Sequence, residues 1–395
     1  MLTRGRKARV AVRPEAAHSA LPPLHLPCVL DILSRLAPGE RLLASAVSRA
    51  WRAAVAQPSL WTSVDFTQEA IRSPDALLTA VVSKAAGRIK DLRVWFCKGA
   101  TSVPALAAAV EANANSLRSL NMLSTPFHAV RAEENGLCLM KDDVDGWLLA
   151  APNLTSFEAD VLYRRSDLIK DAHALLTGQG PYSVVRLGRL LLDGFSADEV
   201  LLLAREIRLH PSLEELVIWN TPLNTPAVLG AIADATIACD WSSSLSFSVC
   251  NLGPQSATYF ARMLPHLSML LIENDENDEP LFDAASRDVW AAALRLSSLT
   301  ALRLDDVGLW GGEGVGNVLV DALVGHPTLE EISLLKNRIR FDDSQNTVGA
   351  CWARLLAANS PSLRTLLWRS VKLATMLCVP FLKRWQATQR CARCI

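Results

Sequence analysis

The sequence lacks the features that mark membrane, secreted and nucleic-acid-binding proteins. No apolar run reaches the length of about 18 residues that a bilayer span requires. Its 40 basic and 40 acidic residues cancel, so no overall field favours DNA, RNA or a lipid surface. The nine cysteines are odd in number, scattered, and accompanied by no secretory signal, which predicts reduced thiols. We therefore expect a cytoplasmic and/or nuclear protein with no nucleic-acid and no membrane partner.

Motifs for catalysis, cofactors and metals are also weak. The glycine-rich residues 308–316 follow an expected strand, but they lack the third glycine and the ribose-binding acid of a dinucleotide site. Cys391 and Cys394 form a C-x-x-C pair with no second ligand pair at zinc spacing. The acidic residues 273–279 lack the glycine of a calcium loop. No histidine stands at nucleophile spacing from a serine or cysteine. We expect no enzyme activity, no cofactor and no metal.

The most informative segment lies near the start of the chain. Apolar residues recur at helical spacing from Leu24 to Leu36, and the Ala-Pro-Gly-Glu sequence at 37–40 predicts that one helix ends and another begins there. A second stripe ends at Trp51, and the segment closes with Pro-Ser-Leu-Trp at 58–61. A three-helix unit of this size buries little surface alone, yet it carries many large apolar residues. The segment therefore either packs on the rest of the chain or binds a partner.

The apolar and aromatic residues of this segment resemble the F-box family in type and spacing. There is one departure: His25 stands where the family has its early proline. The resemblance implies docking on a Skp-family adaptor and, through it, on a cullin–RING ubiquitin ligase. It implies that Trp51 and Trp61 form the interior of the unit. The residues expected to contact the adaptor are Leu24, Pro27, Ile32, Leu33, Leu36, Leu42 and Val47.

The rest of the chain repeats one phrase: Leu, two residues, an apolar residue, one residue, an apolar residue, and often Asn or Asp. Copies recur at roughly 30-residue spacing, which suits one strand and one helix per unit. Helical stripes lie between them at 197–209, 226–238, 284–296 and 314–324. Representative copies are Leu117-Leu120-Met122, Leu154-Phe157-Ala159, Leu187-Leu190-Leu192, Leu213-Leu216-Ile218, Phe247-Val249-Asn251, Leu267-Leu270-Ile272, Leu299-Leu302-Leu304 and Leu329-Ile332-Leu334.

This phrase, with the sequence around residues 306–323, resembles the ribonuclease-inhibitor type of leucine-rich repeat. The expected fold class is α/β: a leucine-rich-repeat solenoid (a horseshoe, parallel sheet inside and helices outside) preceded by a small all-α three-helix F-box. We expect a disordered basic tail at 1–20, the F-box at 21–67, a linker helix at 68–87, the solenoid at 88–375, and a C-terminal cap or tail at 376–395. A loop is expected near Pro126.

In such an array the residues between the buried apolar positions face the inner, concave surface. Acids outnumber bases there and two tryptophans are available as anchors, so one hypothesis is that this surface binds a basic segment of a target protein. The alternative is a solvated charged face. The residues expected on it are Trp95, Glu158, Asp160, Asp193, Glu215, Trp219, Glu273, Arg303, Asp305 and Glu331.

Together the two resemblances imply a substrate-recognition subunit of an SCF-type (Skp–cullin–F-box) E3 ubiquitin ligase. The F-box would bind the adaptor and the repeats would bind a target protein. The alternative is a non-degradative leucine-rich-repeat scaffold or adaptor protein. A regulator of another enzyme, such as a GTPase activator, has little support in the sequence.

Overall fold

This computed structural model describes residues 25–67, 74–96, 102–124, 139–164, 174–207, 213–238, 243–274, 280–310, 315–337, 354–355, 358 and 363–367. The predicted tails at 1–20 and 376–395, the loop near Pro126 and the C-x-x-C pair lie outside these residues. Within them, no helix combines the length and the apolar character that crossing a membrane requires.

The chain begins with a small helical unit. Its helices are α1 (Leu26–Ser34), α2 (Pro38–Ala44) and α3 (Arg49–Val55), followed by the short 3-10 helix η1 (Pro58–Trp61). Proline at the start of α1, α2 and η1 costs no hydrogen bond, because the first N–H groups of a helix have no partner within it. The Glu40 carboxylate accepts from the Ala37 N–H, and the Ser48 hydroxyl accepts from the Trp51 N–H. The predicted helix break at 37–40 is thus confirmed.

Within the described residues a parallel sheet of 12 strands follows, and its spatial order is the sequence order except for β4, which lies beside this path and pairs with β5. Neighbouring strands run parallel throughout this sheet. The strands are β1 (Ser63–Asp65), β2 (Asp91–Phe96), β3 (Ser119–Ser124), β4 (Leu139–Met140), β5 (Ser156–Arg164), β6 (Val185–Asp193), β7 (Glu215–Trp219), β8 (Ser243–Ser248), β9 (Leu267–Glu273), β10 (Ala301–Asp305), β11 (Glu331–Ser333) and β12 (Thr365–Leu367).

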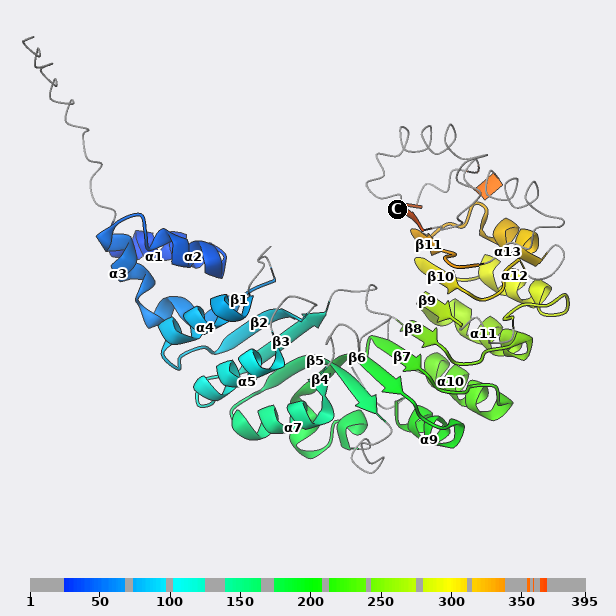
Figure 1. Cartoon of the computed structure of the whole chain (residues 1–395), viewed down its shortest axis with the longest axis horizontal. Helices are drawn as coiled ribbons and strands as arrows, with labels where there is room; N and C mark the ends of the chain where they lie inside the picture. Colours follow the sequence, from blue (N-terminus) through cyan, green and yellow to red (C-terminus); the bar gives the residue numbers. More distant parts are fainter. Residues whose placement is uncertain are drawn as a thin grey trace, which may run out of the picture.

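Helices alternate with the strands and cover one face of the sheet. Figure 1 shows an open arc with the strands along its inner side and the helices along its outer side. The architecture is therefore an open α/β solenoid behind a helical unit, as predicted, and the four expected helical stripes form the helices Ala197–Ile207, Pro226–Ala238, Arg287–Arg295 and Val315–Leu323. The helices are α4 (Pro74–Ala85), α5 (Val103–Ala112), α7 (Lys141–Ala150), α9 (Ala197–Ile207), α10 (Pro226–Ala238), α11 (Ala257–Met263), α12 (Arg287–Arg295) and α13 (Val315–Leu323), with 3-10 turns η2 (Gly180–Val184), η3 (Pro254–Ser256) and η4 (Leu264–His266).

The apolar positions of the repeated phrase form continuous buried rows across the sheet. Leu190, Leu216, Leu245, Leu270 and Leu302 are register partners on consecutive strands from β6 to β10, and each is buried. Successive side chains of a strand point to opposite faces, so this row faces the helices. The buried residues of the helical unit and of the solenoid form one hydrophobic cluster.

A left-handed turn recurs directly after the strands. Gly194, Asn220, Val249 and Asp306 occupy this position and have positive φ, as does Lys336, three residues after the end of β11. The N–H of each of the first four bonds to a carbonyl at the end of the next strand: Gly194 to Trp219, Asn220 to Ser248, Val249 to Glu273, and Asp306 to Leu335. Glycine, asparagine and aspartate tolerate this conformation better than other residues. The left-handed backbone conformation thus accounts for the Asn or Asp of the phrase at Asn220 and Asp306.

Three sequence predictions are corrected by the strand pairing. The sheet begins at β1, inside the predicted F-box, so α4 is the first helix of the solenoid rather than a linker and the boundary at 88 is too late. The copy Phe247-Val249-Asn251 is wrong, because Leu245 and Phe247 fill the buried rows and Val249 lies in the turn. Between β5 and β6 the phrases do not align, because Leu190 pairs with Val161 rather than with Phe157, and a bulge at Ala159 shifts the register further.

Candidate protein-binding surfaces

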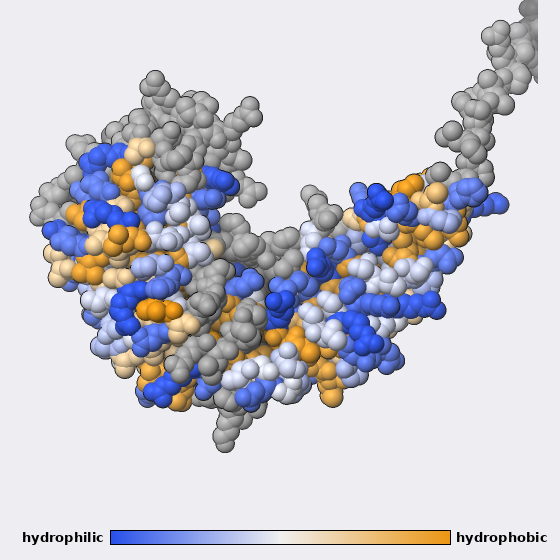
Figure 2. All heavy atoms as spheres, turned by 180° about the vertical axis from the view of Figure 1, so that it is seen from behind, coloured by the Kyte–Doolittle hydropathy of each residue, from blue (hydrophilic) through white to orange (hydrophobic). Residues whose placement is uncertain are grey.

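Exposed hydrophobic side chains are concentrated in the helical unit. Among the described residues, eight large hydrophobic side chains are exposed, and four of them lie between residues 26 and 47. These four are Leu26, Ile32, Leu43 and Val47, and we call them the apolar surface of the helical unit; Leu43 and Val47 are 75% and 68% exposed. Figure 2 shows hydrophobic residues at the surface of this end of the molecule. Such a local concentration is typical of a protein interface.

The predicted adaptor contacts fall into three groups. Pro27, Ile32 and Val47 are exposed, while Leu36 and Leu42 are half-buried against the core. Leu33 is fully buried, so the prediction that it contacts a partner is wrong; it packs inside the unit because it follows Val29 by one helical turn. Leu24 lies outside the described residues. Leu43, which is not among the predicted contacts, is the most exposed residue of the apolar surface of the helical unit.

The interior of the unit is built around Trp61 and Arg41. Trp61 is fully buried, and its Nε1 donates to the Val55 carbonyl at 2.9 Å; Trp51 is partly buried against the same core. Arg41 is 8% exposed, and its guanidinium carbon lies 5.7 Å from the centroid of the Trp61 ring. Sequence reasoning missed Arg41, because a lone arginine in a helix is usually read as a solvated residue.

The helical unit is joined directly to the solenoid. β1 pairs with β2 from Ser63 to Asp65, and the N–H groups of Lys90 and Asp91 both bond to the Thr62 carbonyl. Helix α4 also packs against η1 and α2. The apolar surface of the helical unit remains exposed although the unit packs on its own chain.

The inner face of the sheet presents three rows of side chains. The first row contains Arg189, Glu215, Ser244, Met269, Ala301 and Glu331, the second Leu191, Val217, Ser246, Leu271, Arg303 and Ser333, and the third Asp193, Trp219, Ser248, Glu273 and Asp305. Seven of the predicted inner-face residues lie in these rows. Glu158 lies on β5, and its carboxylate accepts from Asn121 on β3. The side chains of Trp95 and Asp160 lie outside what the structure describes.

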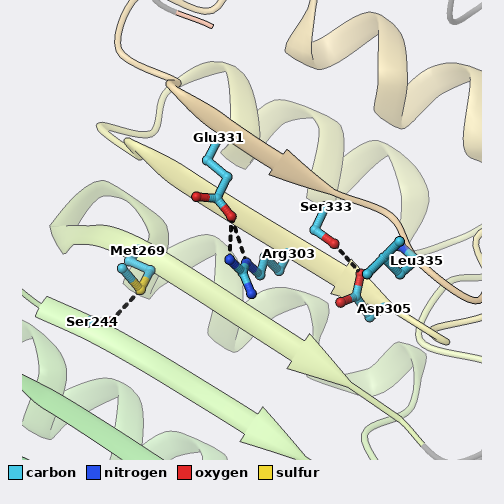
Figure 3. A network of polar contacts seen from close by, with 7 residues as sticks. All are labelled: Ser244, Met269, Arg303, Asp305, Glu331, Ser333 and Leu335. Atoms are coloured by element: carbon cyan, nitrogen blue, oxygen red, sulfur yellow. Dashed lines mark hydrogen bonds and ion pairs between the residues drawn. The ribbon is translucent and has the colours of Figure 1, made fainter. Parts of the chain in front are cut away.

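The charges of the first two rows are paired between neighbouring strands. The Arg189 guanidinium contacts the Glu215 carboxylate at 2.6 Å. Arg303 is 7% exposed, and its Nε and Nη2 donate to one Glu331 oxygen at 2.8 and 2.5 Å (Figure 3). Ser246 additionally donates to Glu215 at 3.1 Å. A basic target would have to compete with these internal partners, so the first two rows offer it little free negative charge.

The third row holds two neighbouring carboxylates, Glu273 and Asp305, which have different hydrogen-bond partners. Glu273 accepts from the Lys336 ammonium at 2.5 Å, and the Lys336 side chain is 50% exposed. Asp305 accepts from the Ser333 hydroxyl at 2.8 Å and the Leu335 N–H at 2.7 Å (Figure 3). Burial raises the pKa of Asp305 to about 6, and the nearby Glu273 carboxylate acts in the same direction. Trp219, half-buried in the same row, is the aromatic anchor of this surface.

One contact between a histidine and a serine resembles a catalytic pair, but both side chains belong to the packing between repeats. His326 Nε2 lies 3.1 Å from the Ser297 hydroxyl and 3.1 Å from the Leu294 carbonyl, and burial lowers the pKa of the imidazole. Both side chains are buried between repeats, and the Ser297 hydroxyl donates to Leu294 at 2.8 Å. The sequence spacing did not predict this contact, since the two residues come from different repeats. Within the described ranges no group of three or more His, Cys, Asp or Glu side chains is arranged to hold a metal ion.

Comparison with known proteins agrees with the geometry of the helical unit. The fold defines an open α/β solenoid preceded by a small helical domain with an exposed apolar surface. A family model described as F-box-like matches residues 26–67, the segment that forms α1, α2, α3, η1 and β1. No curated protein matches the chain. The N-terminal domain is thus F-box-like, which supports an adaptor role in general.

Proposed function

We propose that this chain is the substrate-recognition subunit of an SCF-type E3 ubiquitin ligase. In this proposal the F-box-like domain docks on a Skp-family adaptor, which links it to a cullin–RING ligase, and the inner face of the solenoid binds a target protein. The observation that carries the proposal is the apolar surface of the helical unit, which stays exposed on the segment that matches the F-box-like model. The setting we propose is cytoplasmic and/or nuclear.

The proposed mechanism is proximity. One hydrophobic cluster continues from the helical unit into the solenoid, and β1 belongs both to the F-box-like segment and to the sheet. A target on the inner face would therefore be held at a fixed position relative to the adaptor. Binding both partners on one stiff body raises the effective concentration of target lysines near the ubiquitin-loading subunit. Other subunits would perform the ubiquitin chemistry.

The proposed target contact is the third row of the inner face. Lys336 is half-exposed where it binds Glu273, so a basic side chain of a target would exchange with it more easily than with the enclosed Arg189 or Arg303. Trp219 in the same row offers apolar contact area. A target with a basic residue beside an apolar one fits this row best.

The adaptor contact is tested by pull-down of the full-length chain from cell extract. We expect Ile32→Asp and Val47→Asp to abolish recovery of the adaptor and the cullin, because each places a charge on the apolar surface of the helical unit. Leu202→Asp is the matched control, since Leu202 is 52% exposed on the distant helix α9. Recovery unchanged in both F-box variants would refute the proposal. Failure of the wild-type chain to recover either protein would favour the non-degradative scaffold.

The target contact is tested by proximity labelling with the proteasome inhibited. Trp219→Ala combined with Glu273→Lys should remove labelling of the target while adaptor recovery stays intact. Glu111→Lys, on the exposed side of α5, reverses the same charge away from the inner face. Equal target labelling by all three proteins would show that the third row is not the contact.

A further inference from the structure

A cavity of about 310 Å³ lies where the helical unit meets the solenoid. It is lined by residues of α1, α2, η1 and the start of β1: Leu30, Ser34, Arg41, Ser59, Leu60, Thr62 and Ser63. Four of these residues carry hydroxyl groups, and Arg41 is the one charged residue among them. Leu30 and Ser34 lie one turn apart on one side of α1, whereas Ile32 points to the other side. The cavity is therefore separate from the apolar surface of the helical unit.

Arg41 holds the walls of this cavity together. Its Nε donates to the Leu36 carbonyl at 2.8 Å, its Nη2 to the Ser34 carbonyl at 2.8 Å, and its Nη1 to the Leu60 carbonyl at 3.1 Å. The Ser34 carbonyl is the last of α1, and the helix dipole favours a cation at this end. These bonds use three of the five N–H groups of a guanidinium. Carbonyl dipoles hold the cation, but they do not neutralise its charge.

The positive charge of Arg41 has no carboxylate counter-charge among the residues that the structure describes. Within the described ranges no carboxylate forms an ion pair with it, in contrast to Arg189 and Arg303, and burial lowers the pKa of its guanidinium. Buried charges in proteins are as a rule paired with a counter-charge. Ser59 and Ser63 are exposed at the rim, so their hydroxyls are accessible from solvent. The cavity thus combines a buried cation, open hydroxyl donors and room for a small anion.

We propose that this cavity binds an oxyanion, a phosphate or carboxylate group, with Arg41 as the counter-charge and the hydroxyls of Ser59 and Ser63 as additional donors. Guanidinium groups match the geometry of both anions and bind them with charge-assisted hydrogen bonds. Because the cavity joins α1, η1 and β1, the anion would also bridge the helical unit and the first strand of the sheet. This site does not depend on the proposed adaptor or target contacts.

The test is thermal unfolding of the full-length protein in sodium phosphate, sodium acetate and sodium chloride at matched ionic strength and pH. At about ten times the Kd we expect phosphate or acetate to raise Tm by about 2 °C above chloride. A response to phosphate alone identifies a phosphate group as the ligand, a response to acetate alone identifies a carboxylate, and a response to both shows that the site accepts either oxyanion. Equal Tm values in all three salts would overturn the proposal.

Two variants locate the effect. Ser63→Asp supplies a carboxylate from the cavity wall, so we expect its Tm to be raised in chloride and its response to phosphate and acetate to be lost. Ser83→Asp adds the same charge at an exposed position of α4 and should respond as the wild type does. If Ser63→Asp fails to fold, Ser59→Asp makes the same substitution on η1. An anion response that persists in the cavity variant would show that the anion binds elsewhere.

Discussion

Gly316 packs tightly against the indole ring of Trp310. A Cβ atom added to Gly316 would stand 2.1 Å from two carbon atoms of that ring, far inside van der Waals contact. Gly308, in the same glycine-rich segment, has a φ of 68° and approaches Pro280. Close packing and backbone conformation therefore explain the two glycines of this segment that the structure describes.

Gly316→Ala should destabilise the protein by about 1 to 2 kcal/mol, because displacing the Trp310 ring costs more than the gain in helix propensity. Gly230→Ala is the control: it lies in α10, and its Cβ would meet Tyr259 at an ordinary 3.6 Å. That variant should be neutral or more stable by up to about 1 kcal/mol. Urea unfolding of both variants measures the difference, and equal effects would contradict the predicted packing.

Arg303→Met should lower the free energy of unfolding by about 1.5 to 3 kcal/mol, because it leaves the half-buried Glu331 carboxylate without its donors. Adding Glu331→Leu should recover much of the loss, since an apolar pair replaces the ion pair. Arg262→Met provides the contrast: its ion pair with Asp234 has side chains 50% and 67% exposed and should be worth less than about 1 kcal/mol. Similar losses at both arginines would contradict the burial-based ranking.

Asp305→Asn should flatten the pH dependence of stability between pH 4 and pH 6. The pKa of Asp305 is raised from 3.8 to about 6 in the folded protein, so its stabilising contribution is fully present below about pH 3.8 and is lost as the pH rises through about 6. This difference corresponds to at most about 3 kcal/mol. The asparagine side chain keeps an oxygen that can accept the hydrogen bonds from Ser333 and Leu335, and it does not titrate.

The measurement for Asp305 is urea unfolding at half-unit pH steps for both proteins. The difference in unfolding free energy between the wild type and Asp305→Asn should change steadily from pH 4 to pH 6.5 and then level off. A difference that is constant over this range would show that the carboxyl titrates at its ordinary pKa. Arg303 and Glu273, the charged neighbours, are unchanged in this comparison.

Asn337→Ala should destabilise the C-terminal part of the described solenoid by at least about 2 kcal/mol. The Asn337 amide oxygen accepts from the N–H groups of Val307 and Leu309 at 3.2 and 3.1 Å, and its nitrogen donates to the Leu304 carbonyl at 2.6 Å. Alanine would leave these buried backbone groups unpaired. Hydrogen exchange of Val307 and Leu309 should accelerate, whereas Asn153→Ala, at a more exposed position, should leave both protected.

The sequence determined the element order and the direction of each element. Apolar residues at helical spacing, and a phrase that alternates buried and exposed positions, allow few arrangements, and neighbouring units bury their apolar faces only by stacking in parallel. The helix break at 37–40, the four helical stripes and most strand positions were predictable for this reason. The same patterns recur within about 30 residues and need no information about distant contacts.

The tertiary structure alone decided which of those residues remain available to a partner. Strand register brings residues of different repeats together, and this produces the ion pairs of Arg189 with Glu215, Arg303 with Glu331, and Lys336 with Glu273. The sequence identifies a charged residue, but it does not show whether a neighbouring strand neutralises it. The exposure of Leu43 and the enclosure of Arg41 likewise follow from the angles at which the helices pack, and those angles are set by the fit of many side chains at once.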